Sequence, residues 1–133
     1  MNKFIMMVGL PGSGKSTIAK ELSFRENAVL HSSDDLRKEL FGDADNQESN
    51  ELIFQELHKR IHRDLQDGKS VVYDATNLSY KKRKTFLERL KIECNKECHM
   101  VVTPYEKCLK QNSARSRKVP EKVIDRSYAL DVI

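Results

Sequence analysis

The chain has 133 residues, of which 38% are apolar and 33% are charged, and its formal net charge is +4. This balance is typical of one globular domain, which we expect to span 1–133. The chain lacks a membrane-length apolar run and a signal-peptide cleavage site, and its three cysteines suit neither a disulfide framework nor a structural zinc site, so we expect a cytoplasmic protein without membrane contact.

Short apolar segments alternate with helical segments along the chain. In chain order the sequence predicts a strand at 4–8, a helix at 15–24, a strand at 28–31, helices at 34–41 and 48–66, a strand at 71–74, a helix at 80–92, a strand at 99–103, and helices at 105–115 and from 121 to about 130. Gly42 and Gly68 are expected to end two of the helices. No capping signal precedes Ile133, so we expect the last helix to continue beyond it. The alternation predicts an α/β fold in which helices flank a four-stranded parallel sheet.

Residues 9–16, GLPGSGKS, fit the phosphate-binding pattern G-x-x-x-x-G-K-S, and they lie between a predicted strand and a predicted helix, as the pattern requires. The glycines allow a tight turn whose backbone N–H groups face phosphate oxygens. Lys15 is expected to reach the β- and γ-phosphates of ATP, and Ser16 to coordinate Mg²⁺. The predicted nucleotide-binding residues are Gly9, Pro11, Gly12, Ser13, Gly14, Lys15, Ser16 and Thr17. The motif alone does not separate a kinase from a GTPase, a motor or a switch.

Asp74 ends the apolar run at 71–73, which predicts a carboxylate at the carboxyl end of a buried strand. Ligands of an open parallel sheet bind outside the carboxyl ends of its strands, so Asp74 should lie at the same edge as the phosphate loop. A carboxylate there is a candidate ligand of Mg²⁺, although an aspartate that only begins a turn would give the same pattern.

Asp34 and Asp35 follow the second predicted strand and should reach the same edge. Either residue, like Ser32 and Ser33, could cap the helix that follows, because hydroxyl and acidic side chains suit helix N-termini. Alternatively, Asp34 is the carboxylate that a kinase needs beside the attacking hydroxyl. Arg37 lies on the same helix face as Asp34 and could hold an acceptor phosphate. Since a serine can supply the cap, we expect Asp34 to be catalytic and Asp35 to be structural.

Basic residues concentrate in the second half of the chain. Residues 1–78 contain ten Lys and Arg against thirteen Asp and Glu, whereas residues 79–133 contain fourteen against seven, a net charge of +7. This half suits an anionic partner, although solvated helix faces explain the same charge. At about 110–120, Arg115, Arg117 and Lys118 are expected to form either a lid over the transferring phosphoryl group or a plain basic loop.

Four segments of the chain, GLPGSGKST, SSDDLR, VVYDATNL and NSARSRKVPEKVI, resemble in this order the polynucleotide 5′-kinase branch of the P-loop kinases. The wider group includes zeta-toxin-like and other small phosphotransferases. The resemblance covers nearly the whole chain. It implies the three-layer P-loop NTPase fold of a kinase, with a four-stranded parallel sheet flanked by helices.

Residue by residue, the resemblance implies catalytic roles for Lys15, Asp34 and Arg115. Asp34 would be the general base, and Arg115 would be a lid arginine over the donor phosphates. The residues that the resemblance places on the acceptor side are Arg37, Thr76 and Asn77. Such lids usually have a second arginine one turn earlier, where this chain has Gln111. Either Lys110, Arg117 or Lys118 takes its place, or the chemistry is weaker or different.

The sequence therefore predicts an ATP- and Mg²⁺-dependent kinase that phosphorylates a hydroxyl, with the 5′-OH of a polynucleotide as the leading acceptor. A kinase of a small metabolite, nucleoside, nucleotide sugar or antibiotic would share the same donor site. A nucleotide-binding regulator that hydrolyses ATP slowly or not at all would share the phosphate loop.

Overall fold

The computed structural model describes residues 1–10, 13–42, 50–77 and 79–101. In chain order it contains strand β1 (Lys3–Val8), helix α1 (Lys15–Arg25), strand β2 (Val29–Ser32), helices α2 (Ser33–Phe41) and α3 (Asn50–Gln66), strand β3 (Val71–Asp74), helix α4 (Tyr80–Arg89) and strand β4 (Asn95–Met100). The strands form one parallel sheet in the order β2-β3-β1-β4. The predicted α/β fold is confirmed. The helices expected at 105–115 and beyond 121 lie outside the described residues.

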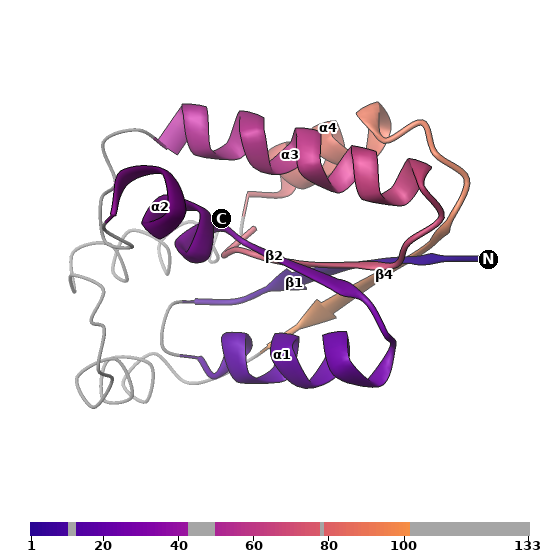
Figure 1. Ribbon diagram of the computed structural model, residues 1–133, viewed down its shortest axis with the longest axis horizontal. Coiled ribbons are helices and arrows are strands. Elements are labelled where there is room, and N and C mark those ends of the chain that lie inside the picture. The colour runs from indigo at the N-terminus through magenta and orange to yellow at the C-terminus, as the bar shows by residue number, and fades with distance from the viewer. Residues whose placement is uncertain (11–12, 43–49, 78, 102–133) are drawn as a thin grey trace.

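Helices cover both faces of the sheet, with α1 on one face and α3 and α4 on the other (Figure 1). Successive side chains of a strand alternate between the two faces, so β1 and β3 supply both layers of the core. The larger buried cluster, under α3 and α4, includes Phe4, Met6, Val71, Tyr73, Ile53, Leu57, Ile61, Leu65 and Phe86. The smaller buried cluster, under α1, consists of Ile5, Met7, Val72, Ala19 and Leu22. None of the helices in the described ranges has the length and apolar character needed to cross a membrane.

Local capping fixes the ends of the helices. At the start of α2, the Ser32 hydroxyl accepts a hydrogen bond from the backbone N–H of Asp35. Gly42 follows α2 directly with a φ of 74°, and Gly68 lies just beyond α3 with a φ of 80°. Both angles belong to the left-handed region, which glycine adopts without strain. The predicted serine cap and the two predicted helix ends are therefore confirmed.

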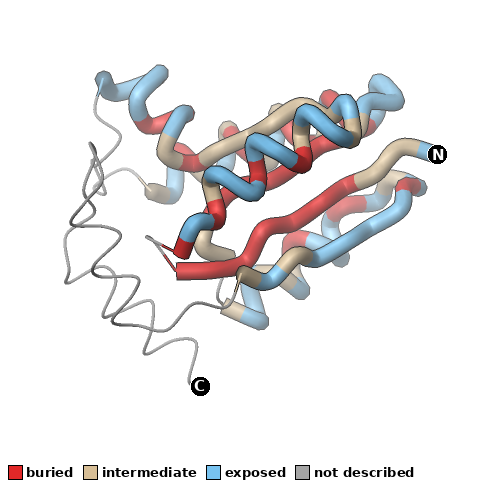
Figure 2. Tube along the Cα trace, turned by 90° about the horizontal axis from the view of Figure 1, so that it is seen from below, coloured by how far each residue is buried: buried red, intermediate tan, exposed pale blue. Residues whose placement is uncertain are grey.

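β4 begins at Asn95 rather than at residue 99, so the predicted start of this strand was wrong. Its backbone pairs with β1 from Lys3 opposite Asn95 to Val8 opposite Met100. As the edge strand it exposes nearly all of its side chains, whereas the central strand β1 is buried along most of its length (Figure 2). An exposed edge strand has no apolar run to reveal it in the sequence.

Candidate active site

The carboxyl ends of β1, β2 and β3 meet at one edge of the sheet (Figure 1). In the parallel pairing, Asp74 lies beside Met7 of β1 and beside Ser32 of β2. Gly9 follows β1 and begins the phosphate loop, and α2 follows β2 directly. The same edge therefore carries the start of the loop, Asp74 and the first turn of α2, which is where ligands of open α/β sheets bind.

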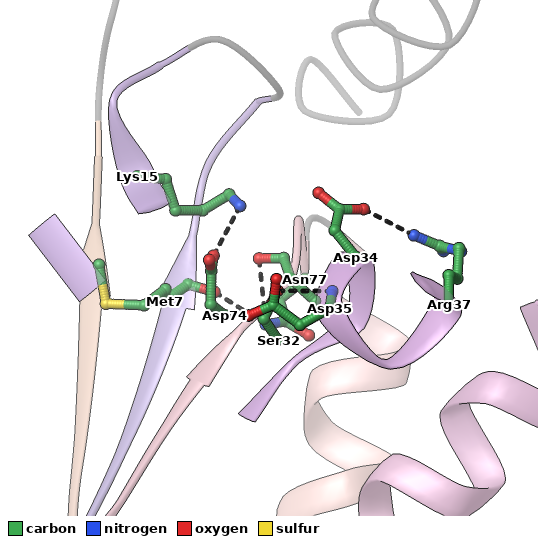
Figure 3. A network of polar contacts seen from close by, with 9 residues as sticks. Met7, Lys15, Ser32, Asp34, Asp35, Arg37, Asp74 and Asn77 are labelled. Carbon is green, nitrogen blue, oxygen red and sulfur yellow. Dashed lines mark hydrogen bonds and ion pairs between the residues drawn. The ribbon is translucent and has the colours of Figure 1, made fainter. Parts of the chain in front are cut away.

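Lys15 and Asp74 form a buried ion pair at this edge. The Nζ ammonium of Lys15, the first residue of α1, donates to Oδ1 of Asp74 over 2.8 Å (Figure 3). The two side chains are only 10% and 5% exposed. Each charge offsets the desolvation of the other, and removal of either partner would leave a buried charge uncompensated. The pair holds a cation and a carboxylate in place where the loop joins the helix.

The described part of the phosphate loop favours glycine at two positions. Gly14 has a φ of 88°, in the left-handed region, and it precedes α1 without offering a side-chain cap. A Cβ atom on Gly9 would lie 3.1 Å from the hydroxyl of Ser13 and 3.1 Å from the carbonyl oxygen of Val101. The first turn of α1 also contains no acidic residue. The positive end of this helix is therefore not neutralised by its own first turn, which favours an anionic ligand.

The other predicted loop residues differ in their exposure. Ser13 is buried, Ser16 is half-buried and Thr17 is exposed. Pro11 and Gly12 lie outside the described residues. The same holds for the whole predicted lid at 110–120, which includes Arg115, Gln111, Arg117 and Lys118.

The first turn of α2 gives the two neighbouring aspartates different surroundings. The backbone N–H of Asp35 donates to the Ser32 hydroxyl over 3.3 Å, and the Asp35 residue is exposed. The Oδ1 atom of Asp34 accepts from Nη1 of Arg37 over 2.8 Å, and the Asp34 side chain is 32% exposed. Figure 3 shows Asp34 between Arg37 and the pair of Lys15 and Asp74. Of these two neighbouring aspartates, Asp34 is the one whose carboxylate is held by a cation at the sheet edge.

Two residues of α3 hold Arg37 in place, and neither was recognised in the sequence. The Nε and Nη2 atoms of Arg37 donate to Oδ1 of Asn50 over 3.2 and 2.7 Å. The guanidinium carbon lies 5.9 Å from the centre of the Phe54 ring, within cation–π range. These contacts join two consecutive helices through residues that are at least 13 positions apart, so no local pattern could have revealed them.

Thr76 and Asn77, predicted on the acceptor side, connect the end of β3 to β1. The carbonyl of Thr76 accepts from the backbone N–H of Gly9 over 3.0 Å. Asn77 has a φ of 51°, and its Nδ2 donates to the carbonyl of Met7 over 2.8 Å. The carbonyl of Asn77 in turn accepts from Nη1 of Arg83 over 2.5 Å. This segment therefore braces the start of the phosphate loop.

A second group of ionisable side chains lies in the core under α3. The Nε2 atom of His58 lies 3.0 Å from the hydroxyl of Tyr73, and the His58 ring is 4.5 Å from that of Phe86. Burial, together with the nearby His62 and Arg89, lowers the pKa of His58 to about 4. Burial also raises the pKa of Tyr73. Within the described ranges no group of three or more His, Cys, Asp or Glu side chains is arranged to hold a metal ion.

The chain is similar to known proteins over nearly its whole length. A family model described as an AAA domain matches residues 4–130. No curated protein matches the sequence.

Several solved structures share the fold. A chain of the Pnkp1/Rnl/Hen1 RNA repair complex has a TM-score of 0.84 and 25% identity over 98% of this chain and 44% of its own length. A chain of another Pnkp1/Rnl/Hen1 complex has a TM-score of 0.72 and 28% identity over 82% of this chain and 38% of its own. The present chain thus spans less than half of either relative. A gluconokinase from Sinorhizobium meliloti 1021, with a TM-score of 0.69 and 15% identity over 96% of this chain and 74% of its own, shares the fold alone.

Proposed function

Because the chain belongs to the AAA domain family and to the polynucleotide kinase-like group of P-loop kinases, we propose that it transfers the γ-phosphoryl group of ATP to the 5′-OH of a polynucleotide. The observation that carries this proposal is the presence of two ion pairs at one edge of the sheet. Lys15 and Asp74 lie where the phosphate loop meets α1, and Asp34 and Arg37 lie at the start of α2. The first pair suits a phosphate donor, and the second supplies a carboxylate for an attacking hydroxyl.

On the donor side, Lys15 would bind the β- and γ-phosphates together with backbone N–H groups of the loop. Ser16 and Asp74 offer hydroxyl and carboxylate oxygens, which are the ligand types that Mg²⁺ prefers, and these residues would hold the ion. When bound, Mg²⁺ would neutralise charge on the phosphates. Phosphate binding would draw Lys15 away from Asp74 and so make this carboxylate available.

On the acceptor side, Asp34 would take the proton of the hydroxyl as its oxygen attacks the γ-phosphorus. The new P–O bond forms while the bond to the leaving ADP breaks, and the proton stays on the carboxylate. Arg37 would orient Asp34 through the bond of 2.8 Å, and its burial and its bonds to Asn50 favour this positioning role over direct contact with an acceptor phosphate. The hydrogen bonds of Thr76 and Asn77 favour a role in bracing the loop over direct contact with the acceptor.

Arg115 completes the proposed catalytic set as a lid arginine. Its guanidinium would stabilise negative charge on the transferring phosphoryl group. Gln111 stands where such lids usually have a second arginine, so Lys110, Arg117 or Lys118 would have to supply any second positive charge of the lid. Substitution of Arg115 should therefore lower the rate of transfer more than the affinity for ATP.

Two observations support a polynucleotide acceptor. Chains of an RNA repair complex are similar to this chain in sequence and fold, and residues 79–133 have a net charge of +7, which suits a polyanion. The gluconokinase is similar only in fold, so it gives no comparable support for a sugar.

A labelling assay tests the proposal directly. The purified protein is incubated with γ-labelled ATP, Mg²⁺ and a 5′-OH oligonucleotide, and label is expected at the 5′ end. Parallel reactions contain gluconate, nucleosides or aminoglycosides. Label on a small molecule and none on the oligonucleotide would show that the acceptor is that small molecule. No transfer to the oligonucleotide by a folded, ATP-binding preparation would refute the proposed function.

A further inference from the structure

The N-terminal half of α4 presents an unusual surface beside the proposed site. The ten residues of this helix include five basic side chains and one acidic one. Lys81, Lys82 and Lys84 are exposed, and no acidic side chain in the described part of the chain forms an ion pair with them. We call Tyr80 and these three lysines the α4 surface.

The basic residues of the α4 surface are not explained by the stability of the helix. Ser79 caps α4 by accepting from the backbone N–H of Lys82, but the first turn contains no acidic residue. The N-terminus of a helix carries a partial positive charge, which favours acidic side chains and disfavours basic ones. Conflicts between local preference and sequence of this kind concentrate at functional sites.

An exposed aromatic ring begins the same helix. The Tyr80 residue is 70% exposed. The guanidinium carbon of Arg83 lies 5.9 Å from the centre of the Tyr80 ring, and Nη1 of Arg83 donates to the carbonyl of Asn77 over 2.5 Å. Arg83 is therefore anchored to the backbone while it contacts the ring. An exposed aromatic ring beside lysines is the combination that binds single-stranded nucleic acid, through base stacking and phosphate contacts.

Hydrogen bonds connect this surface to the phosphate loop. Arg83 is bonded to the carbonyl of Asn77, and Asn77 is bonded through its side chain to the carbonyl of Met7, two residues before Gly9. The carbonyl of Thr76 accepts directly from Gly9. The first turn of α4 is thus fixed next to the sheet edge at which the transfer is proposed to occur.

We propose that the α4 surface binds the acceptor as a single strand, on the nucleotides that follow its 5′ end. The lysines contact its phosphates, and Tyr80 stacks on an unpaired base. The inference rests on the proposed function, because it identifies the bound strand as the acceptor. It adds that recognition extends beyond the reacting nucleotide.

A binding assay tests the role of the lysines. Fluorescence anisotropy measures the affinity of the protein for a labelled single-stranded 5′-OH oligonucleotide of about 12 nucleotides at several salt concentrations. The test variant is K81Q/K82Q/K84Q. The control variant is K20Q/K59Q/K91Q, which has the same change in charge; its substitutions lie on α1, on α3 and just after the end of α4. Each phosphate contact on a single strand contributes about 0.7 to the slope of log K against log salt, so the α4 variant should lose about 2 from this slope. The control variant should lose much less. Equal losses in the two variants would overturn the proposal.

The tyrosine is tested separately in the same assay. Tyr80→Ala should weaken binding about tenfold, whereas Tyr80→Phe, which keeps the stacking ring, should bind like the unaltered protein. Equal binding by the unaltered protein and Tyr80→Ala would refute the stacking. If the protein bound phosphatidylserine vesicles and did not bind the oligonucleotide, the partner of the α4 surface would be a membrane surface instead of a nucleic acid.

A comparison of acceptors separates this inference from the proposed function. For the K81Q/K82Q/K84Q variant, kcat/KM should fall about tenfold more for the oligonucleotide than for a nucleoside 3′-monophosphate. An equal fall for both acceptors would overturn the inference and leave the kinase intact. Oligonucleotide binding that depends on the α4 surface, without transfer to any acceptor, would support the binding surface and refute the proposed function.

Discussion

Arg37 donates a hydrogen bond of 2.8 Å to Asp34, and the arginine side chain is only 6% exposed while that of the aspartate is 32% exposed. A buried cation thus orients a carboxylate that solvent still reaches. Such an arrangement suits a general base, which must be held in one direction and yet meet its substrate. The hydrogen bond to Arg37 also distinguishes Asp34 from Asp35, whose backbone N–H is bonded to the Ser32 hydroxyl.

Asp34→Asn should abolish most of the transfer of phosphate while ATP binding is retained. A positioned general base contributes about 10²- to 10⁴-fold in rate, so kcat should fall within this range. Asp35→Asn is the matched control and should lower kcat less than about tenfold. Steady-state kinetics with a 5′-OH oligonucleotide make the comparison. A greater loss in the Asp35 variant would reverse the assignment.

Asn50→Ala should lower both the stability of the protein and its rate of transfer. The substitution removes the oxygen that accepts from Nε and Nη2 of the buried Arg37, at a cost of about 1–3 kcal/mol in the free energy of unfolding. Arg37 is then no longer held by Asn50 and orients Asp34 less firmly, so kcat should fall while the KM for ATP changes little. Urea unfolding and kinetics measure the two effects. Gln55→Ala, at an exposed position one turn further along α3, should change neither.

Lys15→Met should destabilise the protein by about 3 kcal/mol, because it leaves the Asp74 carboxylate buried without its cation. The double variant Lys15→Met/Asp74→Leu removes both charges and should regain most of this free energy of unfolding. Both variants should lack phosphate transfer, so stability and activity would be separated. Urea unfolding provides the stabilities. The single variant Asp74→Leu is measured as well. If the loss of stability in the double variant equals the sum of the losses in the two single variants, Lys15 and Asp74 do not interact as described.

His58 should make the protein less stable as the pH falls below about 6.5. The native state lowers the pKa of His58 to about 4, so the unfolded chain takes up a proton before the native protein does. The stability that depends on neutral His58 is complete above pH 6.5 and is lost as the pH falls toward 4. After allowance for solvent screening this effect is at most about 2 kcal/mol.

The control is His58→Gln, which stays neutral and still offers Tyr73 a polar partner. Urea unfolding between about pH 7 and 5 should show a smaller loss of stability in this variant than in the unaltered protein. If stability depended on pH equally in the two proteins, protonation of His58 would not be the cause of the loss of stability at low pH.

Local patterns predicted the parts of the fold that depend on neighbouring residues. β3 occupies the predicted residues, because three apolar residues in a row and a terminal aspartate suit a buried strand. Ile53, Leu57, Ile61 and Leu65, the stripe on the long helix, are all buried against the sheet. The serine at the start of α2 acts as a cap because capping involves residues only three positions apart.

Contacts between distant segments were not predictable in this way. The bond of Arg37 to Asn50 depends on the packing of α2 against α3, and the bond of Asn77 to Met7 depends on the neighbouring places of β3 and β1. β4 was misplaced for a related reason, since backbone pairing with β1 forms it while its side chains remain exposed. In each case the interaction that decides the structure is between residues that are far apart in the chain.

The exposed edge strand β4 has a consequence for the solubility of the protein. Lys96 and Glu97 are exposed at its centre, and Glu97 also lies 3.7 Å from Lys3. Charged side chains on an edge strand oppose its pairing with a strand of another molecule, which is the first step of β-aggregation. Replacement of both residues by valine would raise the β-propensity of this segment and remove that protection. We therefore expect the K96V/E97V variant to aggregate at a lower protein concentration than the unaltered protein.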